Sequence, residues 1–375
     1  QNKALQMDIQ EKDILYDEDR VVMGRGTFGE VYRTRQQPFG GWRGATVAVK
    51  RLLGGDGKDM EALKGELKAE ALMLALMRHP NIVAFYGVCL DSAEGPLLLT
   101  ELMEGGSLHD RLYKIDNELD PLTHMQKRMV TRDIAAGLLY LHGKDVAHLD
   151  LKPHNVLLTR PPLKAKLCDF GLTRVTRSSI FNIPKMRPGG TPLYMSPEQH
   201  TGGFNVTTKS DIYSFAVLLN ELETFSLPWI DELSIPPGEP NSGTWIMNEV
   251  KRRIKNGERP TLCSGELVGA IITACWAGFA DKRPNMREVM YGRGDVEGAD
   301  GNIVAGWKGY VHIMGLELDE RRHDGLPEVA DKQKDAARVN YNAIFDLDGA
   351  DEPRVRMAVT RSLSLPNSYG NSRGA

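Results

Sequence analysis

The sequence predicts an α+β chain of two lobes, in which a small β-rich lobe precedes a larger α-rich one. Its 375 residues are enough for a large core and for more than one domain. In the stretch 21–53, β-branched residues and alternation predict strands, and paired glycines at 40–41 and 54–55 interrupt them. From residue 122 the pattern is mainly helical, and a Gly-containing joint at 104–107 separates the two halves.

The elements follow in order along the chain. Residues 59–78 have helical periodicity, and one face of this helix carries Leu63, Leu67, Ala71 and Leu74. Two apolar runs, 82–90 and 96–103, predict strands. Four further helices are predicted in the second half, at 122–142, 207–225, 244–256 and 265–279.

Composition excludes several classes of function. The formal net charge is −3 and 26% of the residues are charged, so the basic footprint of a nucleic-acid-binding protein is missing. No apolar run approaches the ~20 residues of a membrane-spanning helix, so we expect no membrane segment. The four cysteines show no metal-binding spacing and the first residues show no signal-peptide core, which favours a reduced, cytoplasmic chain.

Six short motifs occur in one order. They are GRGTFGEV (24–31), AVK (48–50), Glu70 within the predicted helix, HLDLKPHN (148–155), CDFG (168–171) and TPLYMSPE (191–198). Together these motifs contain the charged and backbone groups that phosphoryl transfer from ATP requires. The glycine motif alone is weak evidence, but a strand rather than a helix follows it at Val31, which argues against a dinucleotide-binding turn.

Over residues 14–290 the chain resembles the catalytic domain of the eukaryotic protein kinases. Four strings are similar in particular to the tyrosine-kinase-like group of Ser/Thr kinases: GRGTFGEVYR, TELMEGGSL, SDIYSFAVLLNEL and RPNMREV. The resemblance implies a bilobal fold with one regulatory helix in the small lobe. It divides the chain into an N-terminal approach segment at 1–19 whose residues 14–16 pack on the sheet, an N-lobe and hinge at 20–103, a C-lobe at 104–290 and a divergent, partly disordered region at 291–375.

The same resemblance implies ATP and Mg²⁺ as cofactors. Lys50 would bind the α- and β-phosphates and pair with a helix carboxylate, for which Glu66 and Glu70 compete. Kinase-like helices place this carboxylate nine residues before the His of an HPNIV-type turn. In this chain the turn begins at His79, and Glu70 lies nine residues before it. We therefore expect Glu70 to be the partner of Lys50 and Glu66 to lie on the surface.

Roles for the remaining site residues also come from the resemblance. Asp150 would accept or orient the substrate hydroxyl, Lys152 would neutralise the transferring phosphoryl group, and Asn155 and Asp169 would bind the metal. Thr100 falls at the gatekeeper position. The other expected nucleotide contacts are Gly24, Gly26, Gly29, Val31, Ala48, Glu101, Met103 and Leu157, with Glu101 and Met103 contributing hinge backbone.

Two packing features are implied as well. A hydrophobic spine between the lobes would consist of Leu74, Phe85, His148 and Phe170, anchored by Asp211. Glu198 and Arg283 match a buried ion pair that ties the segment after the DFG motif to the large lobe.

Substrate class and regulation are less fully determined. Lys152 followed by Pro153, together with Thr191, is the Ser/Thr pattern and opposes a tyrosine-specific enzyme, while dual specificity stays open. Leu149 replaces an Arg that normally pairs with a phosphorylated loop residue. Leu149 and the unfamiliar C-terminal region favour the alternative of a pseudokinase-like ATP-binding scaffold, whereas the retained metal and phosphate residues favour an enzyme acting on protein substrates.

Two segments contain candidate phosphorylation sites. Thr176, Ser178 and Ser179 lie among arginines after the DFG motif, although a solvated loop explains them equally well. RSLSLP at 361–366 matches a phosphoserine motif that 14-3-3 proteins bind, with Ser364 as the modified residue. Motifs this short have a high false-positive rate.

Overall fold

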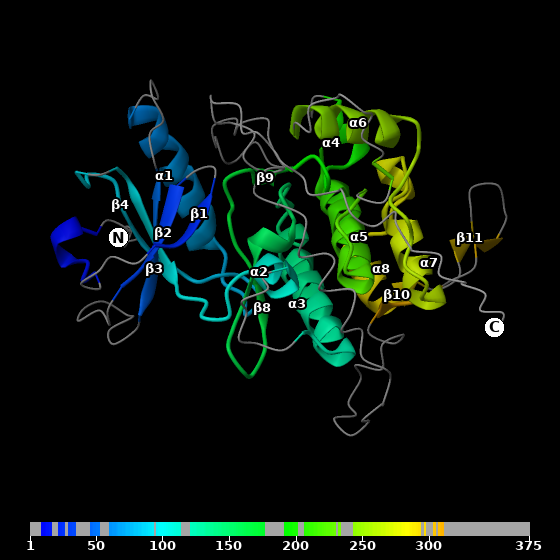
Figure 1. The fold of residues 1–375 in the computed structure, drawn as a ribbon, viewed down its shortest axis with the longest axis horizontal. Coiled ribbons are helices and arrows are strands. Elements are labelled where there is room, and N and C mark those ends of the chain that lie inside the picture. Colours follow the sequence, from blue (N-terminus) through cyan, green and yellow to red (C-terminus); the bar gives the residue numbers. More distant parts are fainter. Residues whose placement is uncertain are drawn as a thin grey trace, which may run out of the picture.

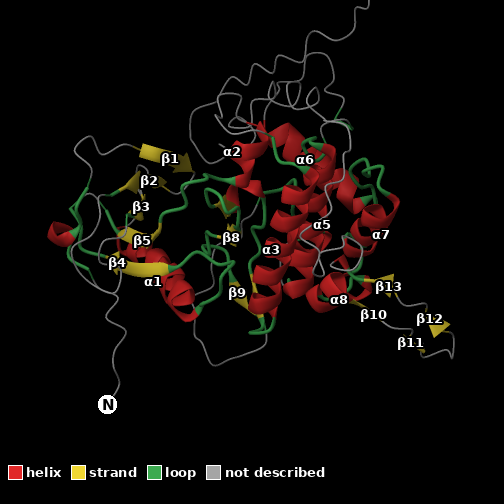
Figure 2. Ribbon diagram, turned by 90° about the horizontal axis from the view of Figure 1, so that it is seen from below, coloured by secondary structure: helices red, strands yellow, loops and turns green. Residues whose placement is uncertain are grey.

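The computed structural model of the chain describes residues 9–16, 22–26, 29–34, 46–52, 60–93, 95–113, 121–176, 191–201, 206–229, 232–233, 243–293, 296–297, 303–304 and 307–310. The larger strands gather on one side of the molecule and most helices on the other (Figure 1). Figure 2 shows the same division in a perpendicular view. The two-lobed α+β fold predicted from the sequence is confirmed.

The small lobe contains a five-stranded antiparallel sheet in the order β1-β2-β3-β5-β4. Its strands are β1 (Val22–Gly26), β2 (Gly29–Arg33), β3 (Val47–Leu52), β4 (Phe85–Cys89) and β5 (Leu97–Glu101). Alternation in β3 directs Val47 and Val49 into a small hydrophobic core. Ile14, which directly follows the 3-10 turn η1 (Glu11–Asp13), packs in this core, as expected for the approach segment. Ala48 and Lys50 therefore lie on the opposite face of the sheet.

Helix α1 (Met60–Leu76) packs against β4 and β5. All four residues predicted to form its inner face are buried, which confirms the periodicity read from the sequence: Leu63, Leu67, Ala71 and Leu74. The face also buries Glu70, a charged residue in an apolar surrounding that needs a partner.

The large lobe is mainly helical. Its helices are α2 (Leu108–Tyr113), α3 (His124–His142), α4 (Pro197–His200), α5 (Thr208–Thr224), α6 (Gly243–Lys255), α7 (Glu266–Cys275) and α8 (Met286–Tyr291), with 3-10 turns η2 (Pro153–Asn155) and η3 (Ala280–Lys282). Two short antiparallel strand pairs accompany these helices: β6 (Val146–Ala147) with β9 (Arg174–Val175), and β7 (Val156–Leu158) with β8 (Ala165–Leu167).

Most predicted helices are confirmed to within two residues, but α7 ends four residues earlier than predicted. The last helical backbone bond runs from the Trp276 nitrogen to the Ile272 carbonyl at 3.0 Å. Beyond it, Arg259 donates to the Trp276 carbonyl and Arg283 donates to the Ala277 carbonyl, at 2.8 Å each. The two guanidinium groups thus satisfy carbonyls that have no helical partner at this end.

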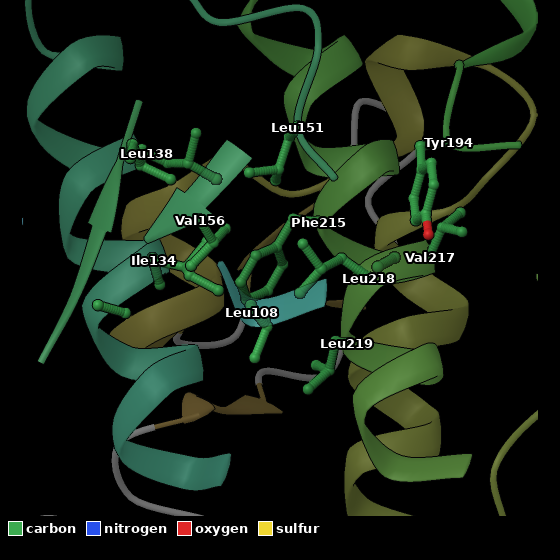
Figure 3. Close-up of a cluster of buried hydrophobic side chains, with 14 of the residues drawn as sticks. Leu108, Ile134, Leu138, Leu151, Val156, Tyr194, Phe215, Val217, Leu218 and Leu219 are labelled. Atoms are coloured by element: carbon green, nitrogen blue, oxygen red, sulfur yellow. The ribbon is translucent and has the colours of Figure 1, made fainter. Parts of the chain in front are cut away.

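Helix α5 forms the centre of the large lobe, because every residue from Ser210 to Leu222 is buried. Figure 3 shows Phe215 within the main hydrophobic cluster, with Val156 and Ile134 on one side and Leu218 on the other. Burying each such side chain contributes roughly 1.5–3 kcal/mol. Phe170 of the DFG motif belongs to the same cluster, so this core also positions the chain next to Asp169.

The predicted ion pair between Glu198 and Arg283 is confirmed. It is bidentate, with distances of 2.7 and 2.8 Å between the guanidinium nitrogens and the carboxylate oxygens. The Arg283 side chain is fully buried. Burial alone would raise the pKa of Glu198, but hydrogen bonds from Arg283 and Ser210 outweigh it and lower that pKa. The pair fixes α4 to the large lobe.

After α8 the chain turns at Gly292 and forms two small antiparallel strand pairs. They are β10 (Gly292–Arg293) with β13 (Trp307–Lys308), and β11 (Val296–Glu297) with β12 (Ile303–Val304). Gly309 crosses so closely that an added Cβ would lie 2.2 Å from the Gly292 nitrogen. Tyr310 then enters the hydrophobic core, so the packed large lobe continues beyond the boundary expected at residue 290. Within the described residues, no helix is both long and apolar enough to span a bilayer.

Lys127 of α3 is a buried cation. Only 2% of the residue is exposed, and its ammonium nitrogen lies 3.7 Å from the centroid of the Phe225 ring. Burial lowers its pKa to about 8, although the nearby Glu223 acts in the opposite direction. The folded protein therefore holds this proton less tightly than the unfolded chain does.

We expect Lys127→Met to reveal this cost. Because the Lys127 pKa falls from 10.5 to about 8 on folding, the charged side chain destabilises the fold below pH 8 and stops doing so above pH 10.5. The free energy of unfolding of the variant, relative to wild type, should fall by up to about 3 kcal/mol as pH rises across this window. Urea denaturation at fixed ionic strength measures the difference, and a value independent of pH would contradict the prediction.

Candidate active site

The predicted glycine loop is the hairpin between β1 and β2. Gly24 pairs with Val31 and Gly26 pairs with Gly29, while Thr27 and Phe28 at its tip lie outside the described residues. Gly29 has a φ of 155°, and an added Cβ would lie 1.9 Å from the Arg51 carbonyl oxygen. Packing against β3 therefore requires glycine at position 29.

Four predicted nucleotide contacts share one face of the sheet. Val31 pairs with Lys50, and Ala48 pairs with Thr100. Directly paired residues, and residues two apart in a strand, lie on the same face. Val31, Ala48, Lys50 and Thr100 are accordingly brought together. Leu157 of β7 comes from the large lobe and is half-buried, like Val31, Ala48 and Thr100.

At the hinge, the Glu101 side chain has a partner in the large lobe. Its carboxylate accepts from Lys166 Nζ at 2.6 and 2.8 Å and from the Ala84 backbone nitrogen at 2.7 Å. Sequence reasoning placed only the backbone of Glu101 and Met103 at the nucleotide, and did not anticipate Lys166. A lysine three residues before Asp169 is too common a pattern to indicate this ion pair from sequence.

Lys50 connects the two lobes electrostatically. Its ammonium nitrogen lies 3.1 and 3.2 Å from the Glu70 carboxylate oxygens and 3.0 Å from Asp169 Oδ1. Glu70 comes from α1 and Asp169 from the large lobe, so one cation joins α1 to the DFG motif. Of the two glutamates that the sequence left in competition, the structure pairs Lys50 with Glu70, while Glu66 is half-exposed.

The charges in this cluster shift the pKa values of its members. Burial disfavours the charged form of Lys50, but Asp169 and Glu70 outweigh it and raise its pKa. Burial also opposes ionisation of Asp169, but Lys50 and Lys152 outweigh it and lower that pKa to about 2. Lys50 is therefore a cation, and Asp169 an anion, at any physiological pH.

Asp150 lies in a second cluster, within the catalytic loop (residues 148–155). Its Oδ1 accepts from the Thr191 backbone nitrogen at 3.1 Å and from the Thr191 hydroxyl at 3.2 Å. Its Oδ2 accepts from Asn155 Nδ2 at 2.8 Å and lies 2.9 Å from Lys152 Nζ. Lys152 also donates to the Thr191 hydroxyl at 2.7 Å. The structure thus brings four residues predicted from the sequence into one network.

Asn155 connects the two clusters. Its Nδ2 donates to the Asp150 carbonyl as well as to the Asp150 carboxylate, and its own backbone carbonyl accepts from Cys168 at 3.0 Å. This backbone bond sets the chain directly before Asp169 beside the catalytic loop. With the amide nitrogen committed to Asp150, the amide oxygen is the Asn155 atom suited to a metal.

Asp211 of α5 holds the catalytic loop through its backbone. This fully buried carboxylate accepts from the backbone nitrogens of His148 and Leu149 at 2.8 Å each, and its Oδ2 lies 2.9 Å from His142 Nε2. His148 in turn stacks at a tilt on Phe170, with ring centroids 5.2 Å apart. The spine members Leu74 and Phe170 are buried in the main cluster and Phe85 packs against it.

Two residues of the site have left-handed backbone. Leu149 has a φ of 67° and Asp169 a φ of 60°. Such conformations cost of order 1–3 kcal/mol each and persist only where the surroundings hold them. Asp211 supplies one such restraint on Leu149, and the Lys50 ion pair supplies one on Asp169.

Sequence reasoning missed two side chains in the activation segment (169–198) and its surroundings. Glu221 is buried and accepts from the Tyr113 hydroxyl at 2.7 Å and the Tyr194 hydroxyl at 2.6 Å, which joins α2, α5 and the activation segment. Gln199 donates to the Leu149 carbonyl at 3.0 Å. Ser196 and Gln199 have the spacing of a capping box, which signals a helix start but not this second contact.

The candidate phosphorylation site Thr176 is engaged in the fold. Its hydroxyl and its backbone nitrogen both donate to the Asp145 carbonyl, at 2.9 and 2.8 Å. These bonds extend the β6–β9 pairing by one residue and fix the first part of the activation segment. Ser178 and Ser179 lie outside the described residues.

Comparison with known proteins agrees with this geometry. A family model described as protein tyrosine and serine/threonine kinase matches residues 19–291. The chain is 32% identical to the serine/threonine-protein kinase CTR1 of Arabidopsis thaliana, over 77% of this chain and 33% of the relative. It is 34% identical to the probable serine/threonine-protein kinase PBL21 of the same plant, over 72% of this chain and 70% of the relative.

A third relative has a different stated specificity. It is the dual specificity protein kinase shkB of Dictyostelium discoideum, 29% identical over 77% of this chain and 41% of the relative. The chain thus spans about a third to two fifths of the length of CTR1 and shkB. The similarity to CTR1 agrees with the prediction that the chain is related to the tyrosine-kinase-like group. The family model covers most of the chain, so the chain belongs to the protein tyrosine and serine/threonine kinase family.

Proposed function

We propose that the chain is a protein kinase that transfers the γ-phosphoryl group of ATP to Ser or Thr hydroxyls of protein substrates in signalling. One observation carries the proposal. The Asp150 carboxylate is held by Thr191, Lys152 and Asn155 next to the Lys50–Asp169 ion pair. An acceptor for a hydroxyl proton thus stands beside groups that fit phosphates and a metal.

The donor set fits Mg²⁺. Asp169 offers a carboxylate that stays ionised, since its pKa is lowered to about 2, and Asn155 offers an amide oxygen. Magnesium prefers hard oxygen ligands of this kind, supplied by one or two side chains and by substrate phosphates. When bound, Mg²⁺ would neutralise charge on the phosphate oxygens.

The chain's own residues would perform the remaining work by position and charge. Lys50, held by Glu70, presents an ammonium to the phosphates. Asp150 orients the acceptor hydroxyl and takes up its proton, and Lys152 compensates the charge of the transferring group. Because these groups are fixed before reaction, little reorganisation opposes the transfer.

Thr191 supports Ser/Thr specificity. Its hydroxyl lies between Asp150 and Lys152, at 3.2 and 2.7 Å, and so restricts the space beside the acceptor position. The names of CTR1 and PBL21 agree with this specificity, and that of shkB keeps dual specificity as the alternative. The pseudokinase-like scaffold is the other alternative. The two assembled clusters, Lys50 with Asp169 and Asp150 with Lys152, argue against it.

We also propose a cytoplasmic location for this domain. All four cysteines are free thiols, as expected in a reducing compartment: Cys89, Cys168, Cys263 and Cys275.

We expect Asp150→Asn to lower phosphoryl transfer to a generic basic protein by roughly 10²–10⁴-fold, because the neutral amide cannot accept the hydroxyl proton. Binding of Mg²⁺–ATP to this variant should change little. In the control Asp169→Ala, the affinity for ATP should no longer depend on Mg²⁺. Radiolabelled transfer, nucleotide titration and phosphoamino-acid analysis measure these outcomes. Wild-type turnover in the Asn variant would refute the assignment, and phosphotyrosine in the product would favour dual specificity.

The two glutamates of α1 offer a matched pair of variants. Glu70→Gln should lower kcat at least about tenfold, equivalent to 1.4 kcal/mol, because the amide holds Lys50 less firmly than the carboxylate does. Glu66→Gln, one turn away, should remain near wild type. Equal effects of the two substitutions on kcat would contradict the pairing seen in the structure.

We propose further that phosphorylated Ser364 binds 14-3-3 proteins. The residue lies outside the described residues, and the proposal rests on the RSLSLP motif. A fluorescent 14-3-3 protein should bind the phosphorylated chain, and Ser364→Ala should abolish binding while Ser368→Ala, just outside the motif, should preserve it. Binding that survives Ser364→Ala would exclude this site.

A further inference from the structure

Gln199 connects the end of the activation segment directly to the backbone of the catalytic loop. It follows Glu198, whose ion pair with Arg283 fixes α4 to the large lobe. Its Nε2 donates at 3.0 Å to the carbonyl of Leu149, the residue directly before Asp150. We propose that Gln199 is a positioning residue that aligns the catalytic loop for phosphoryl transfer, an inference that rests on the proposed function.

The chemistry of the contacts fixes which way the Gln199 amide points. Its Oε1 accepts from the backbone nitrogen and from the hydroxyl of Ser196, at 3.0 Å each. A backbone N–H can only donate and a backbone carbonyl can only accept, so Ser196 requires the amide oxygen and Leu149 requires the amide nitrogen. A carboxylate at position 199 could serve Ser196 but not Leu149.

Leu149 needs such a restraint because its backbone is left-handed, with a φ of 67°. Its nitrogen donates to Asp211 Oδ1 at 2.8 Å, and its carbonyl accepts from Gln199. Side chains from two elements, α5 and α4, thus hold the two polar groups of this one residue. Since Asp150 is the next residue, the direction of the Leu149 backbone determines where the Asp150 carboxylate meets Thr191.

The Gln199 contact differs from the ion pair that an arginine at position 149 would form with a phosphorylated loop residue. Leu149 has a buried hydrocarbon side chain that cannot pair with a phosphate. The contact between Gln199 and the Leu149 carbonyl is neutral, is made by the unmodified chain and lies in a part-buried position. The catalytic loop of this chain is therefore held through an amide and needs no added charge for that purpose.

Gln199→Glu is the decisive variant. It keeps the shape of the side chain and the acceptor for Ser196, but it sets a carboxylate oxygen against the Leu149 carbonyl oxygen. We expect kcat to fall at least about tenfold. The KM for ATP should stay the same, because Lys50 and Asp169 are untouched. Thr201→Ala serves as the matched control: it removes the exposed hydroxyl that donates to the Glu198 carbonyl at 2.9 Å but leaves the contact between Gln199 and Leu149 intact, and it should behave as wild type.

Hydrogen exchange supplies a readout that does not depend on transfer. In the full chain without nucleotide, amides of the peptide 146–152 should exchange faster in Gln199→Glu than in wild type and in Thr201→Ala. A melting temperature that drops with unchanged exchange and kcat would assign Gln199 a purely structural role and overturn the proposal.

The outcomes separate this inference from the proposed function. Wild type that transfers phosphate, with a Gln199→Glu variant equal to it in kcat, overturns the inference alone. Wild type that transfers nothing refutes the proposed function, and the exchange experiment then decides by itself whether Gln199 holds the loop. Faster exchange together with a lower kcat at constant KM supports both.

Discussion

The structure of the site depends on one buried carboxylate. Asp211 stands in the first turn of α5, where the positive end of the helix dipole favours an anion. It accepts from the backbone nitrogens of His148 and Leu149 and contacts His142, and it is fully buried. A buried carboxylate without such donors would be costly. The central helix and the catalytic loop therefore stabilise each other.

The ion pairs of Lys50 connect the small lobe to the large lobe. Lys50 comes from the sheet, Glu70 from α1 and Asp169 from the large lobe, so the correct placement of all three depends on how the lobes meet. Burial opposes ionisation of Asp169, but Lys50 and Lys152 lower its pKa to about 2, so the ion pair between the sheet and the large lobe persists at physiological pH.

The activation segment is held at both ends by contacts that need no modification. At its start, Thr176 bonds to the Asp145 carbonyl beside the β6–β9 pair. At its end, Thr191 bonds to Asp150, and Gln199 bonds to the Leu149 carbonyl. Leu149 in place of an arginine is compatible with this arrangement, because its backbone carries the restraint rather than its side chain.

The sequence alone determined the elements and most of the site, because residue type and spacing encode them locally. Helical periodicity predicted the buried face of α1, and the kinase-like spacing to His79 selected Glu70 rather than Glu66 as the partner of Lys50. Only the tertiary structure showed the amide of Gln199 at Leu149, or the extension of the core to Tyr310. Those contacts join segments far apart in the chain, and no local period or spacing records which distant backbone group a polar side chain will meet.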